Sequence, residues 1–283
     1  MNRVKNSGFW FVLPGLLGLI VFYLWPFVIA IGNSFMSRPI GGYFVGLRNY
    51  TDLFDSQSFL LGLRNTAFFV AVSVPLNVVI PLCFAKLVKS SGSFKPFYIL
   101  VFLIPLVIPS GSMVFIWRVM FSDNGIINGW LHSFGVEPLN WLNSGLAVLV
   151  VLIIFMWRNI GFNMVLFVVG LSNVPKEYYE AAKVNGASCL QTLRNITLPC
   201  LIPTFAIVLL MSIINSFKAF REVFLLMGNH PHESVYMLQH FMNNNFLTLN
   251  FPRLAAVAVL LVAAISILAW LFATFGRWRA YEA

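Results

Sequence analysis

The chain has 283 residues, of which 59% are hydrophobic and only 10% are charged. So few charges cannot cover a soluble globule of this length, and the composition excludes a soluble enzyme, a disordered chain and a coiled coil. The net charge is +9, but the basic residues are spread singly between apolar runs and form no nucleic-acid-binding patch. The composition therefore predicts an all-α membrane protein with several spans.

The first predicted membrane helix covers about residues 9–31. Arg3 and Lys5 precede it, as basic residues do in a secretory signal peptide. The apolar run is too long for such a peptide, however, and no small-residue cleavage site follows it. We therefore expect this helix to be retained. With the polar outer loop that follows, it forms the N-terminal part of the chain, residues 1–62.

Five further segments have the roughly 20 mostly apolar residues that a helix needs to cross a bilayer. They cover about residues 63–88, 96–120, 146–171, 201–220 and 254–275. We interpret residues 63–275 as a core of five transmembrane helices and residues 276–283 as a short tail. The predicted fold is an all-α membrane protein with six transmembrane helices and a long loop between helices 4 and 5.

The distribution of charge predicts how these helices are oriented. Six spans place both termini on the same side of the membrane. If that side is the cytoplasm, the cytoplasmic segments hold ten basic and three acidic residues, whereas the spans and outer loops hold eight and six. Because Lys and Arg are enriched in cytoplasmic loops, we expect both termini and the loop 172–200 in the cytoplasm of a cell whose inner membrane holds the chain.

The loop 172–200 is too polar to span a membrane, and its residues predict a short helix at its start. Pro175 suits a first helical turn, and Glu177 and Glu180 suit the N-terminal end, where the helix dipole is positive. Gly186 can adopt the left-handed backbone that ends a helix. The loop therefore contains structure of its own.

A second short helix is predicted in the same loop. Ser188 and Gln191 have the spacing of a capping box, in which each side chain caps a backbone N–H of the other residue. Pro199 is predicted to end this helix. From these residues alone, the loop is either a functional pair of surface helices or a hairpin that only connects two spans.

The spacing of residues in this loop resembles that of a known family. The matching residues are Glu180-Ala181-Ala182, Gly186, Ile196 and Leu198-Pro199. Over 20 positions, this pattern resembles the EAA loop of ABC-importer permeases, and its flanking sequence is similar to the carbohydrate-uptake branch. Asn185 departs from the pattern, since many family members have Asp there. Asn tolerates the same helix end but lacks the negative charge.

The resemblance implies that the loop is a cytoplasmic coupling helix that docks on a separate ATPase. In that role Glu180 would pair with a basic group of the ATPase, and the small alanines would allow close approach. The implied coupling residues are Glu180, Ala181, Ala182, Gly186, Leu198 and Pro199. The implied partners are a second homologous permease, two ATPase subunits that bind ATP and Mg, and an extracytoplasmic substrate-binding protein.

Polar residues within the predicted spans are candidates for a substrate pathway. Arg158 lies near the centre of the fourth span, where insertion of a charge costs about 2.5–3.5 kcal/mol. Amide and guanidinium groups can donate hydrogen bonds to sugar hydroxyls, and an indole ring can cover the apolar face of a sugar. The candidate pathway residues are Asn77, Trp157, Arg158, Asn159, Asn163 and Asn215. The alternative is that these side chains hydrogen-bond one helix to another.

Motifs for chemistry are missing from the sequence. It contains no G-x-x-x-x-G-K-[ST] phosphate-binding loop, and its three cysteines do not have metal-ligand spacing. We expect no catalytic residue, metal site or cofactor in this chain. The prediction is therefore a permease subunit that imports a sugar or oligosaccharide and is not an enzyme. The alternatives are a self-contained secondary transporter or channel, and an ABC-importer permease for a non-sugar solute.

Overall fold

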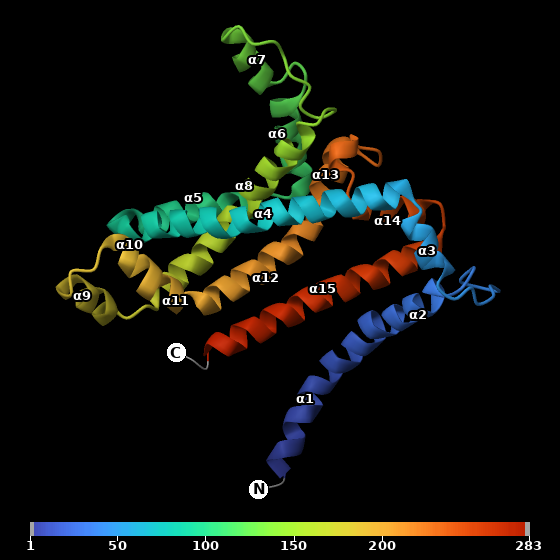
Figure 1. The fold of residues 1–283 in the computed structure, drawn as a ribbon, viewed down its shortest axis with the longest axis horizontal. Coiled ribbons are helices and arrows are strands. Elements are labelled where there is room, and N and C mark those ends of the chain that lie inside the picture. The colour runs from blue at the N-terminus through green and yellow to red at the C-terminus, as the bar shows by residue number, and fades with distance from the viewer. Residues whose placement is uncertain (1–2, 281–283) are drawn as a thin grey trace. The chain divides into compact units, whose positions relative to one another are not determined.

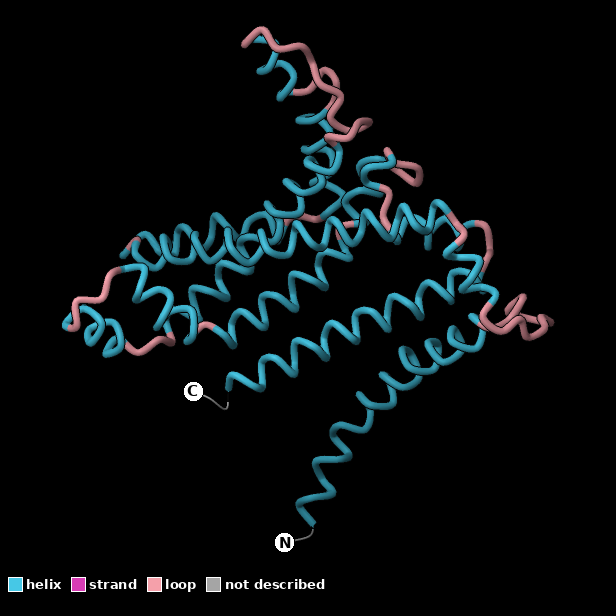
Figure 2. The backbone as a smooth tube through the Cα atoms, in the orientation of Figure 1, coloured by secondary structure: helices cyan, strands magenta, loops and turns pink. Residues whose placement is uncertain are grey.

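The computed structural model describes residues 3–280 of the chain, and the side chains of residues 10–268 and of Trp270. Helices make up most of this range, as the tube in Figure 2 shows. Within it, extended pairing is confined to an isolated bridge between Met36 and Phe44. The predicted all-α fold is confirmed.

Five helical stretches in the described range are long and apolar enough to cross a membrane. They are Trp10–Ser34, Gln57–Ser90, Ala147–Ser172, Ile202–Met227 and Phe251–Leu268. Each overlaps a predicted span. A bent pair of helices, Gly92–Val107 and Ser110–Ser133, raises the number to six if the pair is one span.

The third predicted span, residues 96–120, is wrong as one continuous helix, because the two helices of the bent pair meet at 97°. Ile108 has an extended backbone with ψ of 125°. Pro109 causes this, since the residue before a proline is disfavoured in the helical region. The apolar run is therefore split between α5 (Lys95–Val107) and α6 (Ser110–Phe121).

The chain forms two compact units. The first consists of the described residues up to Leu60 together with Phe241–Leu268, and the second of Leu61–His240 with the described residues from Ala269 on. The predicted three-part division of the chain stays a prediction. Helices of the first unit are α1 (Arg3–Leu19), a π-helical turn (Ile20–Leu24), α2 (Trp25–Ser34), α3 (Arg48–Phe54) and most of α15 (Phe251–Ala280).

The second unit holds most of the remaining helices, which Figure 1 labels in chain order. Besides α5 and α6 they are α4 (Gln57–Ser90), a 3-10 turn (Gly92–Phe94), α7 (Ile126–Ser133), α8 (Ala147–Ser172), α9 (Lys176–Val184), α10 (Cys189–Thr192), a π-helical turn (Leu193–Thr197), α11 (Leu198–Cys200), α12 (Ile202–Lys218), α13 (Phe220–Met227) and a 3-10 turn (Glu233–Val235). α4 and α14 (Leu238–Leu247) are divided between the units, since the start of α4 up to Leu60 and the part of α14 from Phe241 on belong to the first.

The centre of the second unit is α8, which contributes to three clusters of buried apolar side chains. Gly161 allows α5 to approach α8 closely, because a Cβ atom at this position would lie 1.8 Å from the carbonyl oxygen of Phe102. Such contacts between small residues and backbone are typical of membrane helices, which gain little from the hydrophobic effect. α8 can therefore present polar groups to several neighbouring helices.

The segment 176–200 forms two short helices and their turn, which we call the α9–α10 hairpin. It lies at the end of the second unit where α4 ends, at the left of Figure 1. Gly186 ends α9 with φ of 71°, and the N–H of Ala187 donates to the carbonyl oxygen of Ala182 at 2.9 Å. This is the glycine helix end that the sequence predicts.

The predicted capping box is also confirmed, and the helix that it begins ends at Cys200, one residue beyond the predicted end at Pro199. The N–H of Gln191 donates to Ser188 Oγ at 3.2 Å, and the N–H of Ser188 donates to Gln191 Oε1 at 2.7 Å. From Ser188 the helix runs through α10 and the π-helical turn into α11, so Pro199 lies in its last turn.

Candidate functional site

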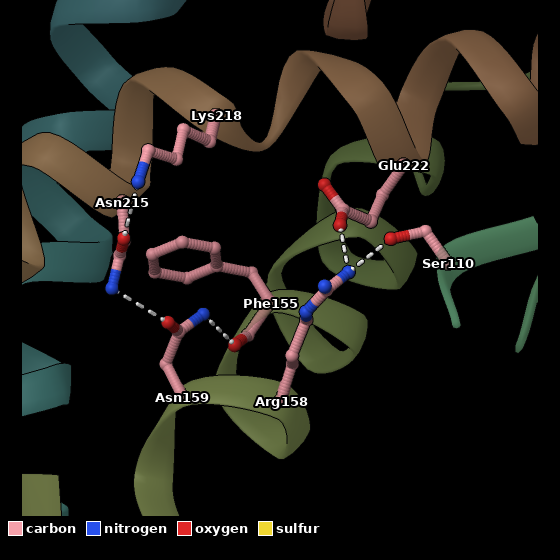
Figure 3. A network of polar contacts seen from close by, with 7 residues as sticks. All are labelled: Ser110, Phe155, Arg158, Asn159, Asn215, Lys218 and Glu222. Atoms are coloured by element: carbon pink, nitrogen blue, oxygen red, sulfur yellow. Dashed lines mark hydrogen bonds and ion pairs between the residues drawn. The ribbon is translucent and has the colours of Figure 1, made fainter. Parts of the chain in front are cut away.

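A polar cavity of about 260 Å³ lies beside the middle of α8 and is called the α8 cavity here. Figure 3 shows all of its polar residues except Arg221; they come from α8, α12 and α13. Its lining comprises Leu106, Phe155, Arg158, Asn159, Asn215, Lys218, Arg221 and Glu222. Three of the predicted pathway residues, Arg158, Asn159 and Asn215, therefore line one cavity.

Arg158 is held by an ion pair on one side of the cavity. Its Nη1 donates to Glu222 Oε1 at 2.5 Å and to Ser110 Oγ at 2.6 Å (Figure 3). The side chains of Arg158 and Glu222 are 22% and 13% exposed, so the pair is partly withdrawn from water. The contacts join α8 to α13 and to the start of α6. A charge inside a span is stabilised by such a partner.

A chain of hydrogen bonds lines the other side of the cavity. Lys218 Nζ donates to Asn215 Oδ1 at 3.4 Å, and Asn215 Nδ2 donates to Asn159 Oδ1 at 3.1 Å. Asn159 Nδ2 in turn donates to the carbonyl oxygen of Phe155 at 2.8 Å. Each of the two side-chain amides is thus oriented by a neighbour, as the dashed lines in Figure 3 show.

Asn77 and Asn163, also predicted on the pathway, do not line the cavity. Asn163 is 1% exposed, and its Nδ2 donates to the carbonyl oxygen of Asn77 at 3.0 Å and to Ser212 Oγ at 3.1 Å. Pro81 explains the first bond, since it has no N–H for the carbonyl oxygen four residues before it. Asn163 thus joins α8 to α4 and α12 at a backbone group that a proline has freed.

Trp157 faces α6 rather than the α8 cavity or the contact with α4. Its ring meets that of Trp117 edge to face, with centroids 5.4 Å apart, in an apolar cluster that includes Phe121. Successive helical residues point about 100° apart, so Trp157 can face α6 while Arg158 and Asn159 face the cavity. The structure therefore brings together three of the six predicted pathway residues. It places the side chains of Trp157 and Asn163 in contacts between helices, in which Asn77 takes part through its backbone carbonyl oxygen.

The α9–α10 hairpin is attached to the helix bundle through its inner face. Lys89, at the end of α4, donates from Nζ to the carbonyl oxygen of Leu171 at 2.6 Å and lies 5.4 Å from the centre of the Tyr179 ring. The hydroxyl of Tyr179 lies 3.3 Å from Thr197 Oγ1. Ala182 is buried on the same face. Because Lys89 contacts both the Tyr179 ring of α9 and the carbonyl oxygen of Leu171, a movement of α9 would displace the ends of α4 and α8.

The outer face of the hairpin is exposed. Glu180 and Ala181 lie on it, and the apolar side chains of Val184 and Leu190 are 88% and 73% exposed. Such an apolar surface with a charged neighbour is typical of a protein-binding face. Of the other predicted coupling residues, Gly186 forms the turn, Leu198 is half-buried and Pro199 is exposed. The two alanines thus lie on different faces of α9, Ala181 on the exposed one and Ala182 on the buried one.

Glu222 and Ser110 were not identified from the sequence as the partners of Arg158. The fifth predicted span ends at about residue 220, because Lys218, Arg221 and Glu222 interrupt the apolar run. The structure continues this span to Met227. A usable signal was present, since Glu222 is the one acidic residue within the five candidate spans and a buried arginine needs such a partner.

A polytopic bundle with a polar cavity beside α8 and an exposed helical hairpin at one end defines a membrane transport subunit. The chain belongs to the family of binding-protein-dependent transport system inner membrane components, which matches residues 66–280. It is a permease subunit of an ABC importer, and its relatives are transport proteins rather than enzymes.

Two relatives and one solved structure illustrate the similarity. The arabinooligosaccharides transport system permease protein AraP of Bacillus subtilis is 34% identical, with 80% of this chain and 74% of AraP covered. The trehalose/maltose transport system permease protein MalF of Thermococcus litoralis is 29% identical, with 81% and 79% covered. A bacterial ABC transporter that imports alginate matches with a TM-score of 0.85 at 18% identity, covering 97% and 96%, which shows the shared fold.

Proposed function

We propose that this chain forms half of the translocation pathway for a sugar or oligosaccharide. The other half comes from a second, homologous permease, and two ATPase subunits and an extracytoplasmic binding protein complete the importer. The sugar assignment is supported by relatives that transport arabinooligosaccharides and trehalose or maltose. It is also supported by the neutral amides of Asn159 and Asn215 in the α8 cavity, which suit hydroxyl groups.

The observation that carries the proposal is the two-faced α9–α10 hairpin. Its inner face is attached to α4 and α8 through Lys89 and Tyr179, while its outer face presents Glu180 and Ala181. A helix anchored in this way can transmit the closure of ATPase subunits into the membrane, giving alternating access to the pathway. ATP and Mg are bound by the ATPase subunits in this scheme, and the permease itself performs no chemistry.

Within the pathway, Arg158, Asn159 and Asn215 are the residues proposed to meet substrate. They line the α8 cavity and are oriented by neighbouring side chains. We assign Asn77, Trp157 and Asn163 to the support of that wall, because each contacts another helix rather than the cavity.

The proposed orientation places both termini and the α9–α10 hairpin in the cytoplasm. The test replaces the three native cysteines by serine and introduces single cysteines at the exposed positions Thr248 and Lys183. In intact cells, a membrane-impermeant thiol reagent is expected to label position 248 and to label position 183 only after lysis. The reverse pattern would contradict the orientation.

The proposed coupling is tested by stiffening the turn of the hairpin. Gly186 has φ of 71°, and a β-branched residue at such a φ costs about 1–2 kcal/mol. G186V is expected to abolish transport and the stimulation of ATP hydrolysis by the binding protein in the purified importer. Gly92 offers a matched control, since it also has a positive φ, of 58°, and open space around it.

G92V is expected to cost similar backbone strain while the binding protein still stimulates ATP hydrolysis. If G186V also retains full stimulation, the hairpin is only a connector and the coupling proposal fails. If both variants lose stimulation equally, the effect comes from general destabilisation, which again leaves no role for the hairpin in coupling.

A further inference from the structure

A second cavity, of about 660 Å³, lies behind the α9–α10 hairpin and is called the hairpin cavity here. Its walls come from the ends of α4 and α8 on one side and from the hairpin on the other. Lys86, Lys89 and Lys183 line it, together with apolar groups such as Leu171 and Leu193, and no acidic residue of the described chain does. The cavity therefore combines positive charge with an apolar wall.

Two of the three lysines are available to a ligand. Lys89 already donates to the carbonyl oxygen of Leu171 at 2.6 Å. Lys86 and Lys183 are exposed and make no hydrogen bond or ion pair with any described residue. Two ammonium groups, one from α4 and one from α9, can thus converge on a single anion between them.

The position of the cavity indicates which anion it suits. Lys86 lies near the end of α4, a helix long and apolar enough to span the membrane, so the cavity opens at the depth of lipid headgroups. Basic pockets between membrane helices on the cytoplasmic side suit anionic headgroups. A free phosphate ion would use the lysines but would leave the apolar wall unused, whereas a phospholipid uses both.

We propose that the hairpin cavity binds the phosphate of an anionic membrane phospholipid through Lys86 and Lys183. The lipid backbone lies against Leu171 and Leu193. Because the two lysines belong to the bundle and to the hairpin respectively, the bound lipid braces α9 against α4. The cytoplasmic location of the cavity and the further claim that lipid occupancy tunes ATPase stimulation rest on the proposed function, whereas the lysine-lined site itself does not.

The test uses the purified importer with all its partner subunits in nanodiscs of phosphatidylcholine, alone or with phosphatidylglycerol added. Native mass spectrometry measures the phosphatidylglycerol retained, and ATP hydrolysis is measured with and without the binding protein. In the double variant K86Q/K183Q, retention is expected to weaken by about fivefold for each lysine. K176Q/R194Q is the matched control, because it removes two exposed basic residues of the same segment that do not line the cavity.

Retention lost in K86Q/K183Q and kept in K176Q/R194Q supports the site. Equal loss in both variants, or equal retention of phosphatidylglycerol and phosphatidylcholine by the wild-type importer, overturns it. Displacement of the lipid by added inorganic phosphate shows that a free phosphate is the ligand and also overturns the lipid assignment. An ATPase that fails to associate contradicts the proposed function instead, and the lipid retained by the permease still reports on the cavity.

Discussion

Two polar regions of α8 lie one turn apart and differ in what surrounds them. Asn159 lines the α8 cavity, where its side chain is partly exposed and bonded to Asn215. Asn163 is 1% exposed and bonds to the backbone of α4 and to Ser212. Two asparagines four residues apart on the same helix thus have different roles: Asn159 lines the cavity, and Asn163 hydrogen-bonds one helix to another. The burial of a polar side chain and its hydrogen-bond partners, rather than its residue type, distinguish a pathway residue from a residue that packs helices together.

The largest expected effect comes from Arg158, because its charge is paired within the cavity wall. R158M leaves the carboxylate of Glu222 without its partner, and we expect a loss of about 2–4 kcal/mol in stability together with low complex yield. The double variant R158M/E222Q removes both charges and should recover yield. Thermal unfolding and complex yield measure this recovery.

Transport by R158M/E222Q then separates two roles of the ion pair. If Arg158 only clamps helices together, transport recovers along with yield. The pathway role predicts that yield recovers while transport stays low. A double variant as unstable as R158M would show that the unpaired carboxylate of Glu222 is not the cause of the instability of R158M, and would remove the basis of this comparison.

The next effect is expected at Asn163. N163L leaves the carbonyl oxygen of Asn77 buried without a donor, and an unsatisfied buried group costs about 1–3 kcal/mol. We therefore expect lower melting temperature and lower complex yield, with transport per assembled complex nearly unchanged. Normal yield with reduced transport would place Asn163 on the pathway, as the sequence analysis predicts.

Asn159 is expected to behave in the opposite way. N159L removes the acceptor of Asn215 at a partly exposed position, so stability should fall by less than about 1 kcal/mol. Transport per assembled complex should drop about tenfold, because an oriented hydrogen-bonding group has been lost from the cavity. The measurement is substrate uptake by reconstituted importer, normalised to the amount of complex. Equal behaviour of N159L and N163L would erase the distinction between the two regions.

The smallest effect near neutral pH concerns His240, a buried polar residue outside the candidate spans. Burial lowers its pKa from about 6.5 to about 4, and the N–H of Met237 donates to its Nδ1 at 3.0 Å. The unfolded chain takes up this proton at a higher pH than the folded one. The free energy of unfolding therefore keeps its full value above about pH 6.5 and falls as His240 is protonated between about pH 6.5 and 4. The fall is about 3 kcal/mol in total, of which less than about 1 kcal/mol occurs by pH 6.

Thermal unfolding of the purified complex at a series of pH values tests this dependence. H240Q is expected to remove most of the slope between pH 6.5 and 4. H132Q, at an exposed histidine, serves as the control and should keep the slope. A wild-type slope in H240Q would show that another group controls the acid sensitivity.

The spans and the hairpin could be predicted from the sequence because their causes are local. An apolar run of sufficient length, a glycine at the end of α9 and the Ser188–Gln191 capping box each act over a few residues. The bend at Pro109 and the extension of the fifth span to Met227 were missed. In the first case a proline changed the direction of a helix within an apolar run, and in the second an ion pair allowed charged residues inside one.

The roles of the polar residues could not be predicted because they depend on distant partners. The partner of Arg158 lies 64 residues further along the chain, and Asn163 meets a carbonyl group 86 residues before it. Asn159 and Asn163 share one face by spacing, so the sequence could not separate them. The position of α8 among α4, α6 and α12 decides which residue is buried and which lines the cavity.

The central claim is that the outer face of α9 contacts an ATPase subunit, and Ala181 and Ala182 allow a direct measurement. Ala181 is exposed, whereas Ala182 is 8% exposed and faces the bundle. In an importer whose permease has no other cysteine, a photoactivatable thiol-linked probe is placed at either position. The account predicts cross-linking to the ATPase subunit from A181C and little from A182C. Equal cross-linking from both positions, or none from A181C, would contradict it.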